Sequence, residues 1–504
     1  MGDLPSPTVT SAESCDVPIQ ATPFSQAKSI FRNFASLTAA MAASRLSALA
    51  SNAVLARRVS TSGYGITGIA QTVTIYFGLL SDLGLGTVAL REGAQHPERL
   101  QSVISSMMGL RLLLASAACV LGLLVSPYLP FSEGSRALLR FYLLTLPIQA
   151  LSVDWIFRAV QRMYWNTILE SAAAALTLIL TIVLVREPRD LLRMGGIVAV
   201  TAAVTALLGI FILSRQGYHA RPTFSLSQAK YFLGQSLPLC ASFLSVLLYS
   251  QANNLILGAV RSEADVGLYG AAIRMNQVFY LPIWLFFGAM APALMQSWVH
   301  SPERARALLS TSVRISATFT IGSGVVAASA GSWLIVKIFG KPFAGAGQAF
   351  EIMIWTEVVV AIGHNWSELC IAAKKNRFLV QSNFLGAIVN IVVCAATVSR
   401  MGTKGAALGT LLAAITVAAL LIWSFGSQLG LGSLQSAAKP AIAGAGAYLI
   451  SLATRWTAPP ICATLSALSY VALLFLTGGI SIGDLKRLRA IMPARKIILE
   501  PTSA

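Results

Sequence analysis

Apolar runs alternate with short polar loops along almost the whole chain. Runs close to the ~20 residues that cross a ~30 Å hydrocarbon core recur from about residue 33 to residue 478, and Gly, Pro and charged residues separate them. This pattern predicts an all-α polytopic membrane protein with about fourteen transmembrane helices. The predicted spans centre near residues 44, 76, 116, 145, 176, 203, 246, 284, 325, 358, 389, 414, 447 and 469.

Two groups of landmarks recur at a spacing of about 205 residues. A Gly-Tyr-Gly group at 63–65 opens the second predicted span, and Gly, Tyr and Gly within 267–270 open the eighth. A Pro-Glu-Arg segment follows each of these spans, at 97–99 and at 302–304. Because this spacing covers an even number of helices, it predicts two six-helix repeats of the same orientation, followed by two C-terminal helices.

The repeat and the composition of the ends divide the chain into five segments. The first is rich in Ser, Pro and Thr and lacks an apolar core, so we expect a disordered tail. Lys and Arg are more frequent in alternate loops and in the C-terminal tail, which predicts that both termini are cytoplasmic. The expected segments are a tail at 1–27, six-helix bundles at 28–222 and 223–430, two extra helices at 431–482 and a basic tail at 483–504.

Composition supports the membrane prediction and excludes several functions. Only 11% of the residues are charged, against roughly 25% in soluble domains. The net charge is +18, but the basic residues are scattered over many loops, so no nucleic acid is expected as a partner. The six cysteines are widely spaced, and no catalytic or phosphate-binding motif is present. We therefore expect no enzyme activity, no metal and no cofactor.

Ionisable side chains within apolar spans are the strongest functional candidates, because each costs roughly 2.5 to 3.5 kcal/mol at a helix centre unless it faces protein or water. Arg45 lies in the first span and Arg274 in the eighth, one in each half. The functional interpretation is that both line a shared cavity and bind a pyrophosphate through their forked donors. The alternative is that each pairs with a membrane carboxylate such as Asp82 or Glu357 and only joins helices.

Further polar residues in the spans could line a cavity or carry an ion. Glu357, His364 and Glu368 are spaced by seven and four residues and so lie near one helix face, where they could form a proton or cation relay. The simpler interpretation is that Glu368 ends the span and His364 bonds within its helix. Asn253 and Asn254 could contact a sugar, although hydrogen bonding between helices is their commoner use.

Three carboxylates near span ends fit a packing role better than a functional one. These are Asp82, Asp154 and Glu170, of which Asp82 could also line a cavity or carry an ion. Arg111 lies at the start of the third span, from which its side chain is expected to reach the cytoplasmic interface.

Several segments resemble one protein family. LARRVSTSGYGITGIAQTVTIYFGLLSDLGLGTVALREGA (55–94) resembles the first helical pair of bacterial polysaccharide-biosynthesis flippases of the O-antigen (Wzx) type. Residues 236–294, which include Pro238, Arg274 and Pro292, are similar to that family's seventh and eighth helices, and DWIFRAVQRM (154–163) resembles its fourth-helix exit. The resemblance covers most of residues 30–490, although family members often carry Asp near the position of Asn253.

The resemblance implies a flippase that moves an undecaprenyl-pyrophosphate-linked oligosaccharide across the bacterial inner membrane by alternating access. The cargo would serve exopolysaccharide, capsule or O-antigen synthesis, and membrane lipids, polymerases and glycosyltransferases are the expected partners. The family lies in the superfamily that also holds multidrug and toxin extrusion antiporters and lipid II flippases. Two alternatives remain: a cation-coupled multidrug antiporter of the same fold, and a membrane-embedded glycosyltransferase or ligase.

Overall fold

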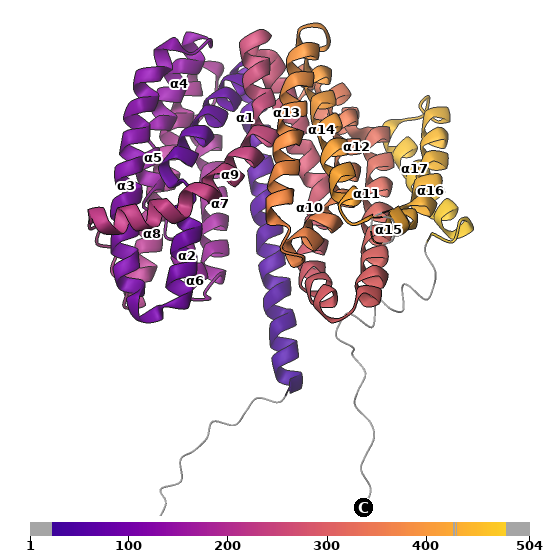
Figure 1. The fold of residues 1–504 in the computed structure, drawn as a ribbon. Coiled ribbons are helices and arrows are strands. Elements are labelled where there is room, and N and C mark those ends of the chain that lie inside the picture. Colours follow the sequence, from indigo (N-terminus) through magenta and orange to yellow (C-terminus); the bar gives the residue numbers. More distant parts are fainter. Residues whose placement is uncertain (1–22, 427–428, 430, 480–504) are drawn as a thin grey trace, which may run out of the picture.

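The computed structural model describes residues 23–426, 429 and 431–479 of the 504-residue chain. These residues form helices and contain no strand. Figure 1 shows a purple bundle from the N-terminal half beside a pink and orange bundle from the C-terminal half, with the yellow helices α16 and α17 at the outer edge. The termini of the chain, including the predicted tails, lie mostly outside the described residues, and the first helix begins at Pro23.

Eight helices make up the N-terminal bundle. They are α1 (Pro23–Asp82), α2 (Leu85–Gln95), α3 (Leu100–Val125), α4 (Glu133–Leu143), α5 (Leu146–Gln149), α6 (Asp154–Ala159), α7 (Tyr164–Leu184) and α8 (Arg193–Arg215). The 3₁₀ turns η1 (Pro97–Arg99), η2 (Ser126–Tyr128) and η3 (Pro188–Leu192) connect some of them.

The rest of the described chain forms the C-terminal bundle and its two appended helices. Its helices are α9 (Leu226–Val260), α10 (Glu263–His300), α11 (Pro302–Phe339), α12 (Ala346–Ala372), α13 (Asn376–Met401), α14 (Thr403–Trp423), α15 (Gly432–Leu434), α16 (Ala438–Ala453) and α17 (Pro459–Leu476). The 3₁₀ turns η4 (Lys341–Phe343) and η6 (Gln435–Ala437) lie between them.

Length and composition make ten of the described helices able to cross a membrane, or eleven if the bent pair Met41–Asp82 and Leu85–Gln95 counts as one span. The other predicted spans correspond to the first part of α1, to the broken series α4 to α6, and to α16, which has 16 residues. The predicted fold class is therefore confirmed: this is an all-α, multi-pass membrane protein.

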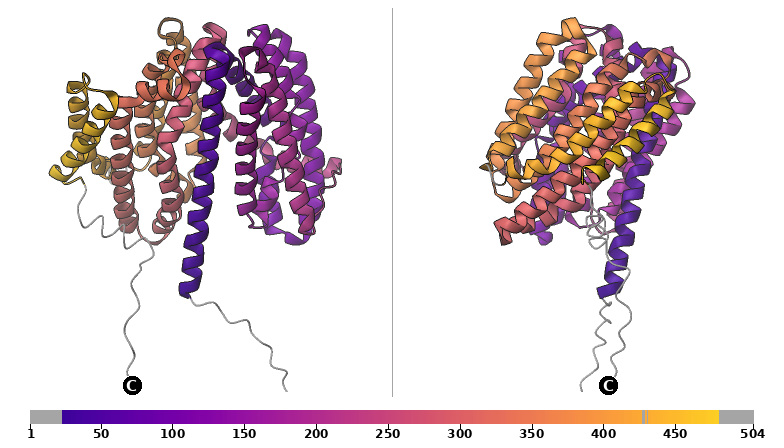
Figure 2. Two further views of the ribbon diagram at one scale, coloured as in Figure 1. Left: turned by 180° about the vertical axis from the view of Figure 1, so that it is seen from behind. Right: turned by 90° about the vertical axis from the view of Figure 1, so that its right-hand side faces the viewer.

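Helix α1 consists of two arms that meet at Ser60, where the backbone is non-helical with φ of 70° and ψ of 173°. We call residues 23–59 the first arm and residues 61–82 the second arm. Figure 2 shows the first arm running between the two bundles. Just before the bend, Arg57 donates to the carbonyl oxygen of Ile338 in α11 (2.9 Å), and Arg58 donates to that of Ile182 in α7 (2.6 Å). The bend is thereby fastened to both halves, at the last turns of two helices, where a cation is favourable.

The two halves touch most closely where the second arm crosses the start of α10. A Cβ atom on Gly65 would lie 1.6 Å from the carbonyl oxygen of Glu263, and one on Gly267 would lie 2.0 Å from that of Thr61. Only a residue without a Cβ atom permits this approach. The two glycines belong to the repeated landmark groups of the sequence, so the landmarks of the two halves pack against each other.

A carboxylate strengthens this contact. The side chain of Glu263 accepts hydrogen bonds from the hydroxyl groups of Ser62 (3.2 Å), Ser135 (2.6 Å) and Ser132. Ser132 and Ser135 lie at the start of α4 and Ser62 in the second arm of α1, so one residue of the C-terminal half bonds two elements of the other half. We call these four residues the glutamate clasp.

Helix α9 links the two bundles. Its first part lies against the N-terminal bundle, where the hydroxyl of Tyr231 donates to Glu92 of α2 (2.9 Å). Its last part lies in the C-terminal bundle, where Asn253 donates to the carbonyl oxygen of Ala406 in α14 (3.0 Å). Pro238, which cannot donate the usual helical hydrogen bond, lies inside the helix between these two parts.

Candidate functional site

Arg274 lies at the interface between the two halves. Its guanidinium donates to the side-chain oxygen of Gln71 in the second arm of α1 (3.1 Å) and to that of Gln277 in its own helix (3.3 Å). The side chain is partly exposed, and the hydroxyl of Tyr64 lies beside it. Within the described chain no carboxylate lies at ion-pair distance from this guanidinium. Arg274 is therefore a membrane-embedded cation among neutral neighbours.

The carboxylates that could have paired with the two predicted arginines have other partners. Asp82 lies 3.0 Å from Arg111, and Glu357 accepts a hydrogen bond from Asn276 of α10 at 2.6 Å. Arg45 is exposed on the first arm of α1 and forms no ion pair with the part of the chain that the structure describes. No contact joins Arg45 to Arg274 among these residues.

The predicted relay on α12 separates into two groups. Nε2 of His364 lies 3.1 Å from a carboxylate oxygen of Glu368 one turn along the helix, and the His364 ring packs on Phe287 with 4.4 Å between centroids. Glu357 instead contacts α10 through Asn276. A relay through all three residues stays a prediction.

The two asparagines of α9 bond other helices. Asn253 donates to the hydroxyl groups of Tyr269 and Thr410, each at 2.8 Å, and Asn254 donates to that of Thr72 in the N-terminal half (3.1 Å). Both asparagines are buried. Their amides therefore join helices in this conformation.

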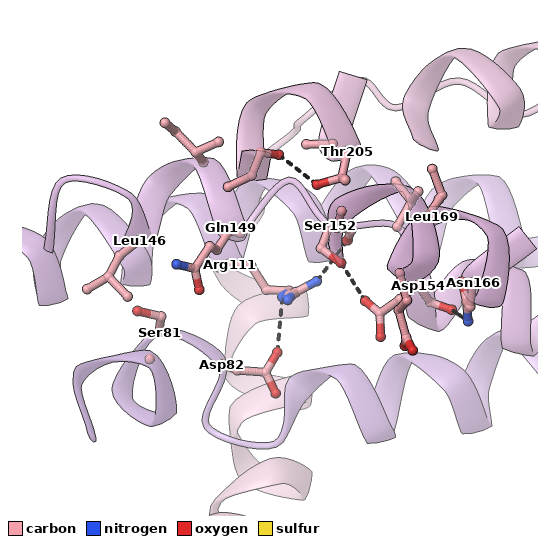
Figure 3. Close-up of a pocket in the computed structure, with 18 residues that line it drawn as sticks. Ser81, Asp82, Arg111, Leu146, Gln149, Ser152, Asp154, Asn166, Leu169 and Thr205 are labelled. Carbon is pink, nitrogen blue, oxygen red and sulfur yellow. Dashed lines mark hydrogen bonds and ion pairs between the residues drawn. The ribbon is translucent and has the colours of Figure 1, made fainter. Parts of the chain in front are cut away.

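A cavity of about 430 Å³ lies inside the N-terminal bundle (Figure 3). The second arm of α1, helices α3, α5, α7 and α8, and the irregular segment between α5 and α6 line it. Its polar lining consists of Ser81, Asp82, Arg111, Gln149, Ser152, Asp154, Asn166, Glu170 and Thr205.

Two breaks in the helices border this cavity. One is at residues 83–84, between α1 and α2, and the other is at residues 150–153, between α5 and α6. The second arm of α1 ends at Asp82, and Leu83 and Gly84 have φ of 47° and 85° before α2 begins. Since α2 continues for 11 residues, or ~16 Å, the break lies well inside the bundle. At the depth of a membrane, irregular backbone is tolerated where it is buried in protein or lines a cavity, and discontinuous helices commonly mark binding sites.

Arg111 of α3 joins the two breaks. Its guanidinium lies 3.0 Å from the Asp82 carboxylate and donates to the carbonyl oxygen of Ser152 at 3.2 Å, which Figure 3 shows as dashed lines. Only 12% of the Arg111 side chain is exposed. The prediction that this side chain reaches the cytoplasmic interface is therefore wrong. The sequence signal for the pair was Asp82 itself, a span carboxylate that needs a cation nearby.

Three other polar residues around the cavity differ in how many hydrogen bonds or ion pairs they form. Asp154 accepts from the Ser152 hydroxyl (2.6 Å) and pairs with Arg158 (3.3 Å). Asn166 donates to the backbone oxygen of Asp154 (2.9 Å), but its own side-chain oxygen is buried without a partner in the described structure. Glu170 is exposed and has no ion pair with the described residues. Among these residues no three His, Cys, Asp or Glu side chains gather as a metal ion requires.

Comparison with known proteins places the chain in a family. A sequence model of the family described as polysaccharide biosynthesis protein matches residues 30–298, which is more than half of the chain. Curated relatives from Escherichia coli (strain K12) and Shigella dysenteriae, assigned as O-antigen transporters, are each 21% identical. The first match covers 48% of this chain and 60% of the relative, and the second covers 64% and 81%.

Solved structures share the fold. Lipid II flippase MurJ in an inward closed conformation has a TM-score of 0.74 and 14% identity over 90% of this chain and 99% of that chain. An inward-facing multidrug resistance MATE family transporter of the MOP superfamily has a TM-score of 0.63 and 13% identity over 79% and 96%. Identities this low establish the architecture alone. Because the family model spans more than half of its length, the chain belongs to the polysaccharide biosynthesis protein family, as its sequence resemblance predicted.

Proposed function

We propose that this protein moves an undecaprenyl-pyrophosphate-linked oligosaccharide across the bacterial inner membrane, with both termini in the cytoplasm, for exopolysaccharide, capsule or O-antigen synthesis. Family membership and the assignment of the two relatives as O-antigen transporters support this proposal. So does the likeness of the fold to a lipid II flippase. Polymerases and glycosyltransferases would supply and consume such a cargo.

The observation that carries the proposal is the position of Arg274. A guanidinium in a membrane-spanning helix is costly unless an anion or water meets it, and Arg274 has only neutral partners among the described residues. Its forked donors match the oxygens of a phosphate. Since Gln71 belongs to one half and Arg274 to the other, a bound pyrophosphate would touch both halves and could influence their relative position.

Alternating access would require the two halves to separate at the glycine contact. The halves are held there by Gly65 against Gly267, by the glutamate clasp, and by Arg57 beside the α1 bend, which bonds α11. The clasp is polar, which suits a contact that must break and re-form. Arg45 on the first arm would contribute a second cation for the pyrophosphate in a conformation that brings it nearer to Arg274.

A cation-coupled multidrug antiporter is the second candidate. The specific observation in its favour is the MATE-like fold, together with carboxylates on helices of both bundles, such as Glu170 of α7 and Glu357 of α12. In a flippase these carboxylates, with the pair His364 and Glu368, could instead couple movement of the cargo to an ion gradient. The unpaired Arg274 argues against an organic cation at the interface, because it would repel one.

The test is transport by purified protein in liposomes. A fluorescent undecaprenyl-pyrophosphate oligosaccharide is added, and the rate at which the label becomes accessible on the far side is measured for wild type, Arg274→Ala and the control Arg189→Ala, whose side chain is 81% exposed. We expect wild type and the control to move the lipid and Arg274→Ala to lose at least about tenfold in rate. Failure of wild type to move the lipid, with extrusion of an organic cation, would establish the antiporter instead.

A further inference from the structure

The cavity in the N-terminal bundle has polar side chains set among apolar ones, and its charges largely cancel. Two of its three carboxylates are each paired with an arginine, Asp82 with Arg111 at 3.0 Å and Asp154 with Arg158 at 3.3 Å. These pairs cancel the charge and still leave lone pairs and N–H groups that can bond a ligand. A site of this kind suits a ligand that has many hydroxyl groups and no charge.

Two of the remaining polar groups, on Asn166 and Glu170, are acceptors that lack a donor among the described residues. Asn166 is only 8% exposed, and its side-chain oxygen has no hydrogen-bond partner in the described structure. Buried polar atoms are rarely left unpaired, so this oxygen indicates a missing donor. The Glu170 carboxylate also lines the cavity without an ion pair there. Hydroxyl groups would donate to both, while the apolar side chains of Leu146 and Leu169 would cover the C–H faces of a ring.

The cavity lies close to the proposed phosphate site along one helix. Gln71, which bonds Arg274, is followed on the second arm of α1 by Gly78 and Asp82, at spacings of seven and four residues. Residues at these spacings share a helix face. At 1.5 Å per residue, Gly78 is ~10 Å and Asp82 ~16 Å beyond Gln71 along the axis. A short oligosaccharide attached to a pyrophosphate at Arg274 could extend over this distance.

We propose that this cavity binds sugar residues of the cargo and thereby selects the glycan, while the pyrophosphate occupies the site at Arg274. The inference rests on the proposed function, and it assigns the glycan to the side chains of Asn166 and Glu170. Movement of the glycan between the cavity and the interface would accompany the change in conformation that releases the cargo.

The test is binding to full-length protein in lipid nanodiscs by calorimetry. The probe is the free oligosaccharide released by mild acid from the lipid-linked precursors of the cells that make the protein, and tetraphenylphosphonium serves as a cationic probe. Asn166→Ala and Glu170→Gln are compared with wild type and with Glu133→Gln, a control in the same half whose side chain is 67% exposed. Glu170 is exposed, so its variant keeps the fold even if Asn166→Ala does not.

We expect wild type and Glu133→Gln to bind the oligosaccharide and both cavity variants to bind it at least about tenfold more weakly. Equal affinity in all four proteins, no oligosaccharide binding by wild type, or binding of tetraphenylphosphonium that Glu170→Gln abolishes would each overturn the inference. Lipid translocation by wild type, measured in liposomes, separates the two proposals. If wild type moves the lipid while the cavity variants bind sugar normally, only the glycan site is wrong; if wild type moves no lipid, the proposed function fails.

Discussion

Gly65 and Gly267 lie so close across the two halves that a Cβ atom on either would overlap the backbone of the other half. A side chain on Gly65 would meet the carbonyl oxygen of Glu263 at 1.6 Å. Main-chain atoms cannot move aside as a flexible side chain can. The two halves of this protein therefore meet at one end through a backbone contact that tolerates only glycine.

Gly65→Ala should destabilise the protein by about 1 to 3 kcal/mol, because the added methyl group forces the second arm of α1 away from α10. Thermal unfolding in detergent measures the effect. The matched control is Gly196→Ala in α8, where a Cβ atom would meet no atom within 4 Å. That substitution should be neutral or stabilise the helix by up to about 1 kcal/mol. Equal behaviour of the two variants would contradict the close contact.

Glu263→Gln should loosen the contact between the halves, because the serine hydroxyl groups of the clasp lose a charged acceptor. Spin labels at the exposed positions Tyr128 and Lys341, one in each half, report the separation of the halves through their electron–electron distance. We expect a larger share of long distances in Glu263→Gln. Glu133→Gln, outside the clasp, should retain the wild-type distance distribution. An unchanged distribution in both variants would show that the clasp does not hold the two halves together.

Arg111→Met should destabilise the N-terminal bundle by about 2 to 4 kcal/mol, since it leaves Asp82 without its cation and the Ser152 carbonyl without a donor. Asp82→Asn should cost less, because 35% of the Asp82 side chain is exposed and water can solvate the amide. In a double-mutant cycle the two positions should couple by about 1 to 3 kcal/mol. Additive effects on the unfolding free energy would show that the ion pair does not join the two helix breaks.

Arg274→Lys separates charge from geometry at the proposed phosphate site. Lysine keeps the positive charge but lacks the planar fork that bonds a phosphate and Gln71 together. We expect its rate of lipid translocation to fall between those of wild type and Arg274→Ala. A lysine variant as slow as the alanine variant would indicate that the fork matters more than the charge, and full activity of both variants would exclude Arg274 from cargo binding.

The positions of most helices along the chain were predictable from the sequence. The thickness of the hydrocarbon core sets the length of each apolar run, and so the spans from α3 to α17 appear near their predicted centres. The cost of charge in lipid drew attention to Asp82, Asp154 and Glu170, but the packing role expected for them did not indicate that all three line one cavity. The repeated glycines were visible as landmarks, although nothing local indicated that they touch.

The sequence by itself determined the class of fold, the approximate positions of the spans and the set of polar residues that needed partners, because each follows from a short stretch of chain and the solvent around it. Only the tertiary structure decided which partners they have. Arg274 meets Gln71 across 203 residues, and Arg111 pairs with Asp82 instead of reaching the interface. Such pairings depend on how distant helices bend and pack. The breaks at Leu83, Gly84 and 150–153 border a cavity only because the fold places them side by side.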